Sequence, residues 1–488
     1  MNPLDAGPAA AGASLRLTLC DGVLIEVPAS LSAITTYVLL EQEAWFEKEV
    51  GFLRHFLKPG MTAIDVGANL GVYSLPMARL VAPDGRVFAY EPGGEARALL
   101  EKSRSENGLA NLEIAGSAVS DGAREGYLAA ASSTELRALS AAGSGEPVHI
   151  TSLDIENAAH GWTSVDFVKI DAEGEEERIL AGAKNFFAAH SPLVMFEIKA
   201  GDAVNERLRA LFPDLGYSTF RQLGGAPILV PDDRTTPLDR YELNLFAAKA
   251  DRAQALARQN LLVEAMPDWT PEATDHADAA SFWQAQAFAT LVPPREDGLL
   301  SGDADYQNAL TGYAAWRATG RSTAVRCAAL AFALKSIRAA CARACTAERA
   351  STWARIAAEW GERNESFGAL NRLTRLLNNV SFQEPFLPAA PRFDGIPVGP
   401  RPLEWFAAAT AEQFEHTLSF SSMFSGVSSV LPWICSHPFA TTEMERRRVL
   451  IAARRGARPK VPPRLCEPAP DHLNAEIWRS GLVPGTVP

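Results

Sequence analysis

Glycines and a carboxylate gather in the segment DVGANLG at residues 65–71, between an apolar run and a helical pattern. Gly67 and Gly71 would let the backbone come close to a ligand, because a Cβ atom there would crowd the contact or forbid the required dihedral angles. Asn69 adds a short polar side chain that tolerates unusual dihedral angles and can hydrogen-bond a ligand. Asp65, at the end of the apolar run, precedes this loop. A carboxylate followed by a glycine loop suits the binding of a nucleoside cofactor.

A second acidic residue, Glu91, closes the next apolar run along the chain. It should lie beside the glycine loop, where a carboxylate can accept hydrogen bonds from both hydroxyls of a ribose. The dinucleotide fingerprint G-x-G-x-x-G is not present, because Asn69 occupies the place of its second glycine, so nicotinamide binding is disfavoured. Taken singly, the motifs also fit a tight turn and an acid that caps a helix. Their order and spacing favour a nucleoside site.

Three further acids follow apolar runs in the same way. Asp171 and Glu173 come directly after one run, and Glu197 closes another. The carboxyl ends of parallel strands face the crevice where ligands bind, so we expect all three near the cofactor loop, with Asp171 as the preferred base. Asp171 and Glu173 could instead hold a divalent metal ion, which the sequence does not favour, or cap the helix that follows. Glu197 should be partly desolvated, with a shifted pKa.

The elements that position these residues are short apolar runs alternating with helical patterns between residues 62 and 247. This alternation predicts a doubly wound, mostly parallel sheet, the α/β class. Pro76 interrupts the first helical pattern and predicts a kink or a late start of that helix. The seven predicted strands span residues 62–66, 87–91, 112–115, 165–171, 193–197, 218–221 and 243–247.

The motifs at these strand ends resemble those of the FkbM family of methyltransferases, over about residues 41–250. The resemblance implies a class I, Rossmann-like methyltransferase fold that moves a methyl group from S-adenosylmethionine to an oxygen, commonly a hydroxyl of a sugar, glycan or polyketide. The candidate catalytic residues, argued above from their place at the strand ends, are Asp171, Glu173 and Glu197. The implied cofactor contacts, with Ser117 beside the adenine, are Asp65, Gly67, Asn69, Gly71, Glu91 and Ser117.

At 488 residues the chain is too long for a single core and should form several domains. Residues 1–40 predict an extension with a hairpin at 15–27, and residues 41–250 the methyltransferase domain. Residues 251–488 predict a mainly helical, repeat-like domain. It contains long Ala-rich helical patterns at 306–319, 323–345 and 347–359, and Pro-rich connections over the surface at 386–402 and 458–470.

The composition of the chain indicates which classes of binding partner to expect. The net charge of −12 disfavours nucleic acid, which attracts clustered basic residues. No apolar stretch reaches the roughly 20 residues that cross a bilayer, and six scattered cysteines fit a reduced, cytoplasmic protein. The acceptor is then a small molecule or a glycan. The alternative is an interaction or scaffold protein, in which the helical half binds a protein partner and the methyltransferase domain is secondary.

Overall fold

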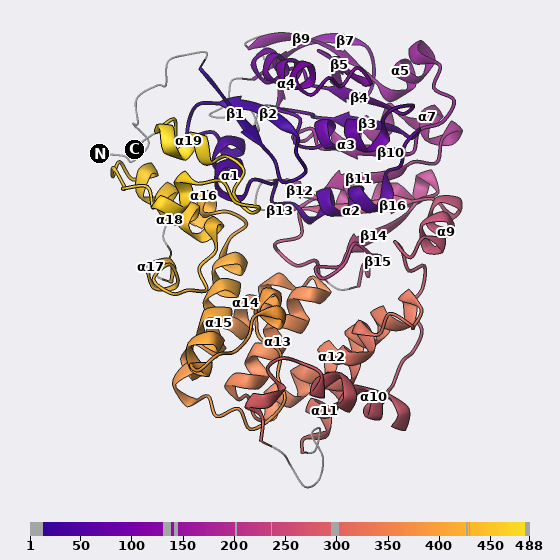
Figure 1. Ribbon diagram of the computed structural model, residues 1–488. Helices are drawn as coiled ribbons and strands as arrows, with labels where there is room; N and C mark the ends of the chain where they lie inside the picture. The colour runs from indigo at the N-terminus through magenta and orange to yellow at the C-terminus, as the bar shows by residue number, and fades with distance from the viewer. Residues whose placement is uncertain are drawn as a thin grey trace.

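The computed structural model describes residues 13–129, 138–140, 145–200, 203–235, 237–293, 302–425, 428 and 430–483. Figure 1 shows two halves, an N-terminal α/β half and a helical half beneath it. Most of the tail predicted at residues 1–14 lies outside the described residues. No helix in the described ranges combines the length and apolar character needed to span a membrane.

The α/β half is built on an eight-stranded mixed sheet. In spatial order the strands are β15 (Leu229–Pro231), β14 (Ser218–Gln222), β16 (Asn244–Ala248), β11 (Leu193–Glu197), β10 (Phe167–Ile170), β3 (Thr62–Val66), β4 (Arg86–Tyr90) and β5 (Leu112–Ala115). The five neighbouring strands from β11 to β5 are parallel, and β16 is antiparallel to both of its neighbours. The predicted parallel sheet is therefore confirmed, with eight strands in place of seven because a short edge strand, β15, pairs with β14.

Helices cover both faces of this sheet, because successive side chains of a strand point to opposite faces. In β11, Leu193 and Met195 pack into one apolar core, and Val194 and Phe196 into another. The first core also holds α1 (Ile34–Gln42), α2 (Lys48–Phe56), α3 (Ser74–Val81), α4 (Gly94–Glu106) and α9 (Ala250–Arg258). The second holds α5 (Leu153–His160), α6 (Glu176–Ala181), α7 (Lys184–Ala189) and α8 (Glu206–Leu211).

Pro76 is accommodated because α3 starts late, at Ser74. The proline lies in the first turn, where its missing N–H removes no bond within the helix.

A small four-stranded sheet follows β5 and was not predicted. Its strands, in spatial order, are β6 (Ala118–Val119), β9 (Glu146–Thr151), β7 (Arg124–Leu128) and β8 (Leu139–Ser140). The segment expected to be a specificity loop, 124–146, thus contains strands, although its residues 130–137 and 141–144 are not described. A short pair, β12 (Lys199–Ala200) and β13 (Ala203–Val204), follows β11.

The helical half stacks consecutive helices around its own core. The predicted Ala-rich helices are confirmed, whereas a repeat architecture stays a prediction. The Pro-rich segment 386–402 does not run over the surface as expected, because Phe386 and Phe393 are buried among the helices. The helices are α10 (Ala273–Gln284), α11 (Ala304–Arg317), α12 (Thr323–Arg343), α13 (Ala347–Trp360), α14 (Arg363–Leu376) and α15 (Pro402–Leu418).

The C-terminal segment returns to the α/β half and packs against the predicted hairpin, which the structure forms as β1 (Ser14–Thr18) and β2 (Leu24–Pro28) (Figure 1). Val449 and Trp478 share one apolar core with Leu17. The Asn474 side chain pairs with the backbone N–H and carbonyl of Thr18. A domain boundary near residue 250 stays a prediction, but part of the chain beyond it completes the first half. The returning helices are α16 (Ser422–Ser425), α17 (Leu431–Ile434), α18 (Thr442–Arg454) and α19 (Ala475–Ser480).

Candidate functional site

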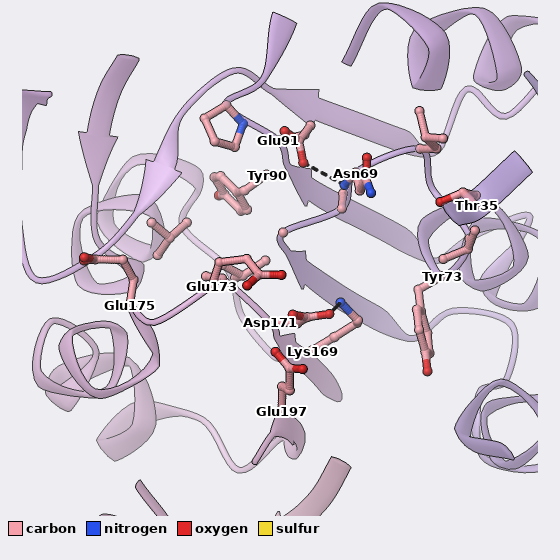
Figure 2. Close-up of a pocket in the computed structure, with 18 of the residues that line it drawn as sticks. Thr35, Asn69, Tyr73, Tyr90, Glu91, Lys169, Asp171, Glu173, Glu175 and Glu197 are labelled. Atoms are coloured by element: carbon pink, nitrogen blue, oxygen red, sulfur yellow. Dashed lines mark hydrogen bonds and ion pairs between the residues drawn. The ribbon is translucent and has the colours of Figure 1, made fainter. Parts of the chain in front are cut away.

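A cavity of about 290 Å³ lies at the carboxyl ends of the parallel strands (Figure 2). Its walls come from the loops after β3, β4 and β10, from the end of β11 and from the small sheet. Six predicted site residues line it: Gly67, Asn69, Glu91, Asp171, Glu173 and Glu197. Three do not: Asp65, Gly71 and Ser117. The sequence motifs thus converge on one cavity, with three residues displaced from it.

The glycine loop adopts the left-handed backbone that its sequence predicts. Gly67, Asn69 and Gly71 have φ angles of +81°, +45° and +90°. A Cβ on Gly67 would lie 1.8 Å from the backbone oxygen of Asp171, so this glycine lets the loop pack against the end of β10. A Cβ on Gly71 would meet the side chain of Leu100 at 2.3 Å. Gly71 therefore seats the loop on α4 and leaves contact with a ligand to its neighbours.

Glu91 joins the loop to the cavity. One carboxylate oxygen accepts a hydrogen bond from the backbone N–H of Asn69 at 2.7 Å, and the other accepts from the backbone N–H of Gly93 at 2.7 Å. Burial raises the pKa of Glu91, and these two amides oppose the shift. The side-chain oxygen of Asn69 is buried with no hydrogen-bond partner. The loop therefore presents an unused acceptor beside a carboxylate that still has spare lone pairs.

Asp65 lies behind the loop and is fully buried. It accepts a hydrogen bond from the Ser74 hydroxyl at 2.5 Å, and its other oxygen lies 3.7 Å from the Lys169 ammonium. Burial raises its pKa, and Lys169 opposes that shift. Asp65 therefore ties α3 and β10 to the end of β3 without reaching the cavity.

Lys169 was not predicted as a site residue, yet it organises the acids. Its ammonium donates to Asp171 at 2.8 Å and lies 5.1 Å from the centre of the Tyr73 ring. Burial alone would lower the pKa of Lys169, but Asp171 and Asp65 outweigh that effect and raise it. The signal was present in the sequence: a lysine inside an apolar strand, two residues before Asp171 and therefore on the same face.

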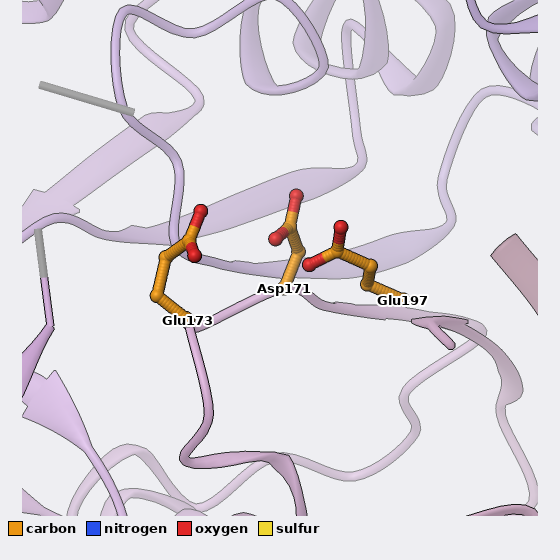
Figure 3. A group of neighbouring side chains, drawn as sticks. All are labelled: Asp171, Glu173 and Glu197. Atoms are coloured by element: carbon orange, nitrogen blue, oxygen red, sulfur yellow. The ribbon is translucent and has the colours of Figure 1, made fainter. Parts of the chain in front are cut away.

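Asp171, Glu173 and Glu197 bring oxygen atoms within 4.8 Å of one another (Figure 3). Burial, and next the charge of Asp171, raise the pKa of Glu197 to about 10. Glu197 therefore carries a proton at neutral pH, and this proton bridges it to Asp171. Glu173 is exposed, on a left-handed residue with φ +49° beside Gly174. A shifted pKa of Glu197 was predicted, and burial raises it. A protonated Glu197 cannot take up the proton of an acceptor, which leaves Asp171 as the candidate base.

A second unpredicted group closes the cavity on the side of α2. The Glu47 carboxylate accepts hydrogen bonds from the Tyr73 hydroxyl at 2.5 Å and from the Asn244 amide at 3.0 Å. Burial raises the pKa of Glu47. Because Asn244 begins β16 and Tyr73 precedes α3, this contact joins segments far apart in the sequence.

The apolar wall of the cavity comes from the small sheet. Ala118, Val119, Leu128 and Leu139 line it, whereas the predicted adenine contact Ser117 lies outside the lining. The residue predicted from the sequence, Ser117, directly precedes the lining residues Ala118 and Val119. It missed Leu128 and Leu139, which follow a region without a clear strand pattern.

Residues 65–219 match the family model of the methyltransferase FkbM domain. The match includes the glycine loop, Glu91, Asp171 and Glu197, and it ends before the helical half. The resemblance predicted from the motifs is therefore confirmed over this range. It supports methyl transfer with S-adenosylmethionine as the donor.

Solved structures with local similarity include three methyltransferases. One is an S-adenosylmethionine-dependent O-methyltransferase from Thermotoga maritima, at 18% identity over 41% of this chain and 64% of that chain, with a TM-score of 0.25. An rRNA methylase from Streptococcus thermophilus has 14% identity over 42% and 96%, with a TM-score of 0.25. An S-adenosylmethionine-dependent methyltransferase from Aquifex aeolicus has 14% identity over 43% and 90%, with a TM-score of 0.25. These scores say nothing of the acceptor. No curated protein matches the chain.

Proposed function

We propose that the chain transfers the methyl group of S-adenosylmethionine to a hydroxyl oxygen of a sugar, glycan or polyketide-type acceptor. The observation that carries this proposal is the position of Asp171. Its carboxylate lies on the same cavity as the glycine loop and Glu91, and a buried lysine fixes it there. A carboxylate in this position can take the proton that a hydroxyl must lose when its oxygen is methylated.

The residues of the cavity fit the methyl donor. Glu91 lines the cavity and would accept the ribose hydroxyls, and the side-chain oxygen of Asn69, which lacks a hydrogen-bond partner, would accept a further donor from the ligand. Ala118 and Val119 offer an apolar surface to the adenine ring. When bound, S-adenosylmethionine supplies a methyl group on a positively charged sulfur, which the surrounding carboxylates attract.

The chain's own residues then align the acceptor and move its proton. Asp171 accepts the proton of the acceptor hydroxyl while the new bond forms between that oxygen and the methyl carbon, and the electron pair of the breaking carbon–sulfur bond stays on sulfur. Lys169 and protonated Glu197 both donate to Asp171 and hold its carboxylate in place. Glu197 is therefore a positioning donor. General-base catalysis of this kind contributes about 10²–10⁴-fold.

A divalent metal ion held by Asp171, Glu173 and Glu197 is the alternative use of the same oxygens, because hard cations bind clustered carboxylates. A proton shared by Asp171 and Glu197 and a bound cation are two ways to relieve the repulsion between these acids. We propose the shared proton, and the effect of a chelator on turnover distinguishes the two.

Methyl incorporation tests the proposal. The full chain is incubated with S-adenosylmethionine labelled in its methyl group and with a panel of glycosides, glycans and macrolide-type polyketides. The expected product carries the label in an alkali-stable ether. Label found on nitrogen, or only on nucleic acid, would contradict the assignment to a hydroxyl.

A further inference from the structure

A second cavity, of about 530 Å³, lies between the two halves of the chain. The α/β half contributes Lys48, Glu49 and Glu242 to its lining, and the helical half contributes residues such as Arg363 and Gln413. The contact between the halves is tight here. The backbone N–H of Gly225 donates to the carbonyl of Glu359 at 2.9 Å, and a Cβ on Gly224 would lie 2.0 Å from the carbonyl oxygen of Ala358.

The second cavity adjoins the one that holds Asp171. Phe46, Glu47 and Leu243 line both cavities, so the two cavities meet along these three side chains. The Phe46 ring packs against Phe420 of the helical half, with 5.1 Å between ring centres. A molecule that extends from the second cavity past these side chains would reach the carboxylates of the first.

Two of the basic side chains on the second cavity are paired with carboxylates, and a third is held by backbone carbonyls. Lys48 pairs with Glu242 at 2.9 Å, and Arg355 pairs with Glu359. Arg363 donates to two carbonyls at the end of α15. An ionic ligand would have to compete with these contacts for its counter-charge.

The remaining surface suits an uncharged ring that carries hydroxyl groups. Phe46, Tyr241 and Phe420 line it, with the Arg363 guanidinium over the Tyr241 and Phe420 rings at 5.1 and 4.0 Å from their centres. Gln413 adds a side-chain amide. Burial raises the pKa of Glu49 to about 8, so at neutral pH its carboxyl group is mostly a hydrogen-bond donor and acceptor without charge. Aromatic faces with a few hydrogen-bonding groups are what a neutral hydroxylated ring requires.

The first cavity is small for both reactants. Pockets for ligands of drug-like size measure about 300–1,000 Å³. At about 290 Å³, the first cavity is filled by the methyl donor and the reacting group of the acceptor. The rest of an acceptor with several rings must lie elsewhere.

We propose that the acceptor is an uncharged, hydroxylated chain of several rings, whose reacting hydroxyl enters the Asp171 cavity while its other rings occupy the interdomain cavity. This inference rests on the proposed function and adds to it that the helical half completes the acceptor site. Specificity for the acceptor then depends on residues beyond the matched methyltransferase domain, with Gln413 among them.

The test measures binding of a labelled full-length chain to an array of neutral oligosaccharides of increasing length and of acidic ones, with S-adenosylhomocysteine present. Gln413→Trp fills the interdomain cavity, and Leu403→Trp, at an exposed position on the same helix, is the matched control. Gln413→Ala is a milder variant of the same position. Calorimetry with S-adenosylmethionine on every variant reports whether the fold and the first cavity are intact.

We expect the wild type to bind neutral chains of several rings better than single rings. Gln413→Trp should weaken this binding about tenfold or more, and Gln413→Ala less, while Leu403→Trp leaves it unchanged. Affinity for S-adenosylmethionine should stay within a few fold throughout. Binding of acidic ligands only, of no array member, or of neutral chains equally by wild type and Gln413→Trp would overturn the inference. Failure of this inference can be distinguished from failure of the proposed function. If the wild type does not bind S-adenosylmethionine, the proposed function itself is refuted.

Discussion

A cluster of charged side chains at the transfer cavity differs from one that lies where the C-terminal segment meets the N-terminal half. In the second, Arg447 lies 3.0 Å from Glu41 and 3.1 Å from Glu415, and all three side chains are at most 2% exposed. In the first, Lys169 is 4% exposed, but its partner Asp171 is 32% exposed. The first cluster opens into the transfer cavity. Arg447, Glu41 and Glu415, called the sealed cluster below, are closed to solvent, and their outer neighbour Glu443 is 29% exposed beside a cavity of about 190 Å³.

The difference separates charge that holds the fold from charge that is available to a ligand. In the sealed cluster, burial alone would lower the pKa of Arg447, but Glu41, Glu443 and Glu415 raise it. In the open cluster, burial and then the charge of Asp171 raise the pKa of Glu197, so Glu197 keeps a proton. Changes in the sealed cluster should therefore affect stability, and changes in the open cluster should affect turnover.

The largest effect is expected for Asp171→Asn. The amide keeps the shape of the side chain but cannot accept the hydroxyl proton, so turnover should fall about 10²–10⁴-fold. Affinity for S-adenosylmethionine should change by only a few fold, because the base acts on the acceptor. Steady-state kinetics and calorimetry measure the two quantities. Asp278→Asn, at an exposed position on α10, is the control. Normal turnover of Asp171→Asn would reduce Asp171 to a helix-capping residue.

In contrast to Asp171→Asn, Arg447→Met should lower the stability of the fold and not act directly on turnover. Removal of one partner leaves the carboxylates of Glu41 and Glu415 buried without their counter-charge, which costs about 3–5 kcal/mol. Denaturant unfolding measures the loss, and Arg372→Met on the exposed face of α14 is the control. If unfolding is unchanged while turnover collapses, the sealed cluster belongs to the chemistry and the comparison between the clusters fails.

A smaller effect is expected for Glu197→Gln. The amide donates to Asp171 as the protonated acid does, so turnover should fall only a few fold, and further in Glu197→Ala. The pH dependence has a definite sign. Between about pH 4.5 and 10 the folded chain holds a proton on Glu197 that the unfolded chain releases, so rising pH destabilises the wild type through this group. Glu197→Gln lacks that proton exchange.

Unfolding of wild type and Glu197→Gln at several pH values checks the sign. The stability of Glu197→Gln relative to wild type should rise with pH across that window. A Glu197→Gln chain as inactive as Asp171→Asn would show instead that Glu197 is itself the base.

Metal removal should have the smallest effect. If a proton joins Asp171 to Glu197, methylation rates in EDTA equal those without it, and added Mg²⁺ changes nothing. Loss of activity in EDTA that Mg²⁺ restores would show that the three acids hold a cation. A chelator that leaves S-adenosylmethionine binding intact while stopping turnover would place that cation at the chemical step.

Much of the α/β half could be predicted from the sequence because its strands are buried on both faces. Such strands read as continuous apolar runs, and three of the predicted strands have the same bounds as β3, β5 and β11. The short edge strand β15 and the small sheet were missed. β15 has only three residues and lies among prolines, and the strands of the small sheet are separated by a long segment. Neither gives an alternation of apolar and polar residues long enough to detect.

The candidate site was predictable where a residue type signals its own role. Gly67, Asn69 and Glu91 follow strand ends, and the topology alone brings them together. Lys169 and Glu47 were missed because their roles depend on the partners they meet in space. The return of residues 442–480 to the N-terminal hairpin was invisible for the same reason, since Trp478 and Leu17 lie at opposite ends of the chain.

The most direct test of the transfer cavity is calorimetric titration of the full chain with S-adenosylmethionine, for wild type and for Glu91→Ala. Glu91 lines the cavity and holds the loop through the Asn69 amide, so its removal takes away both the contact to the ribose and the support of the loop. We predict one binding site in the wild type and an affinity at least about tenfold weaker in Glu91→Ala, with the fold retained. No binding by the folded wild type, or equal binding by both chains, would contradict the assignment of this cavity to the methyl donor.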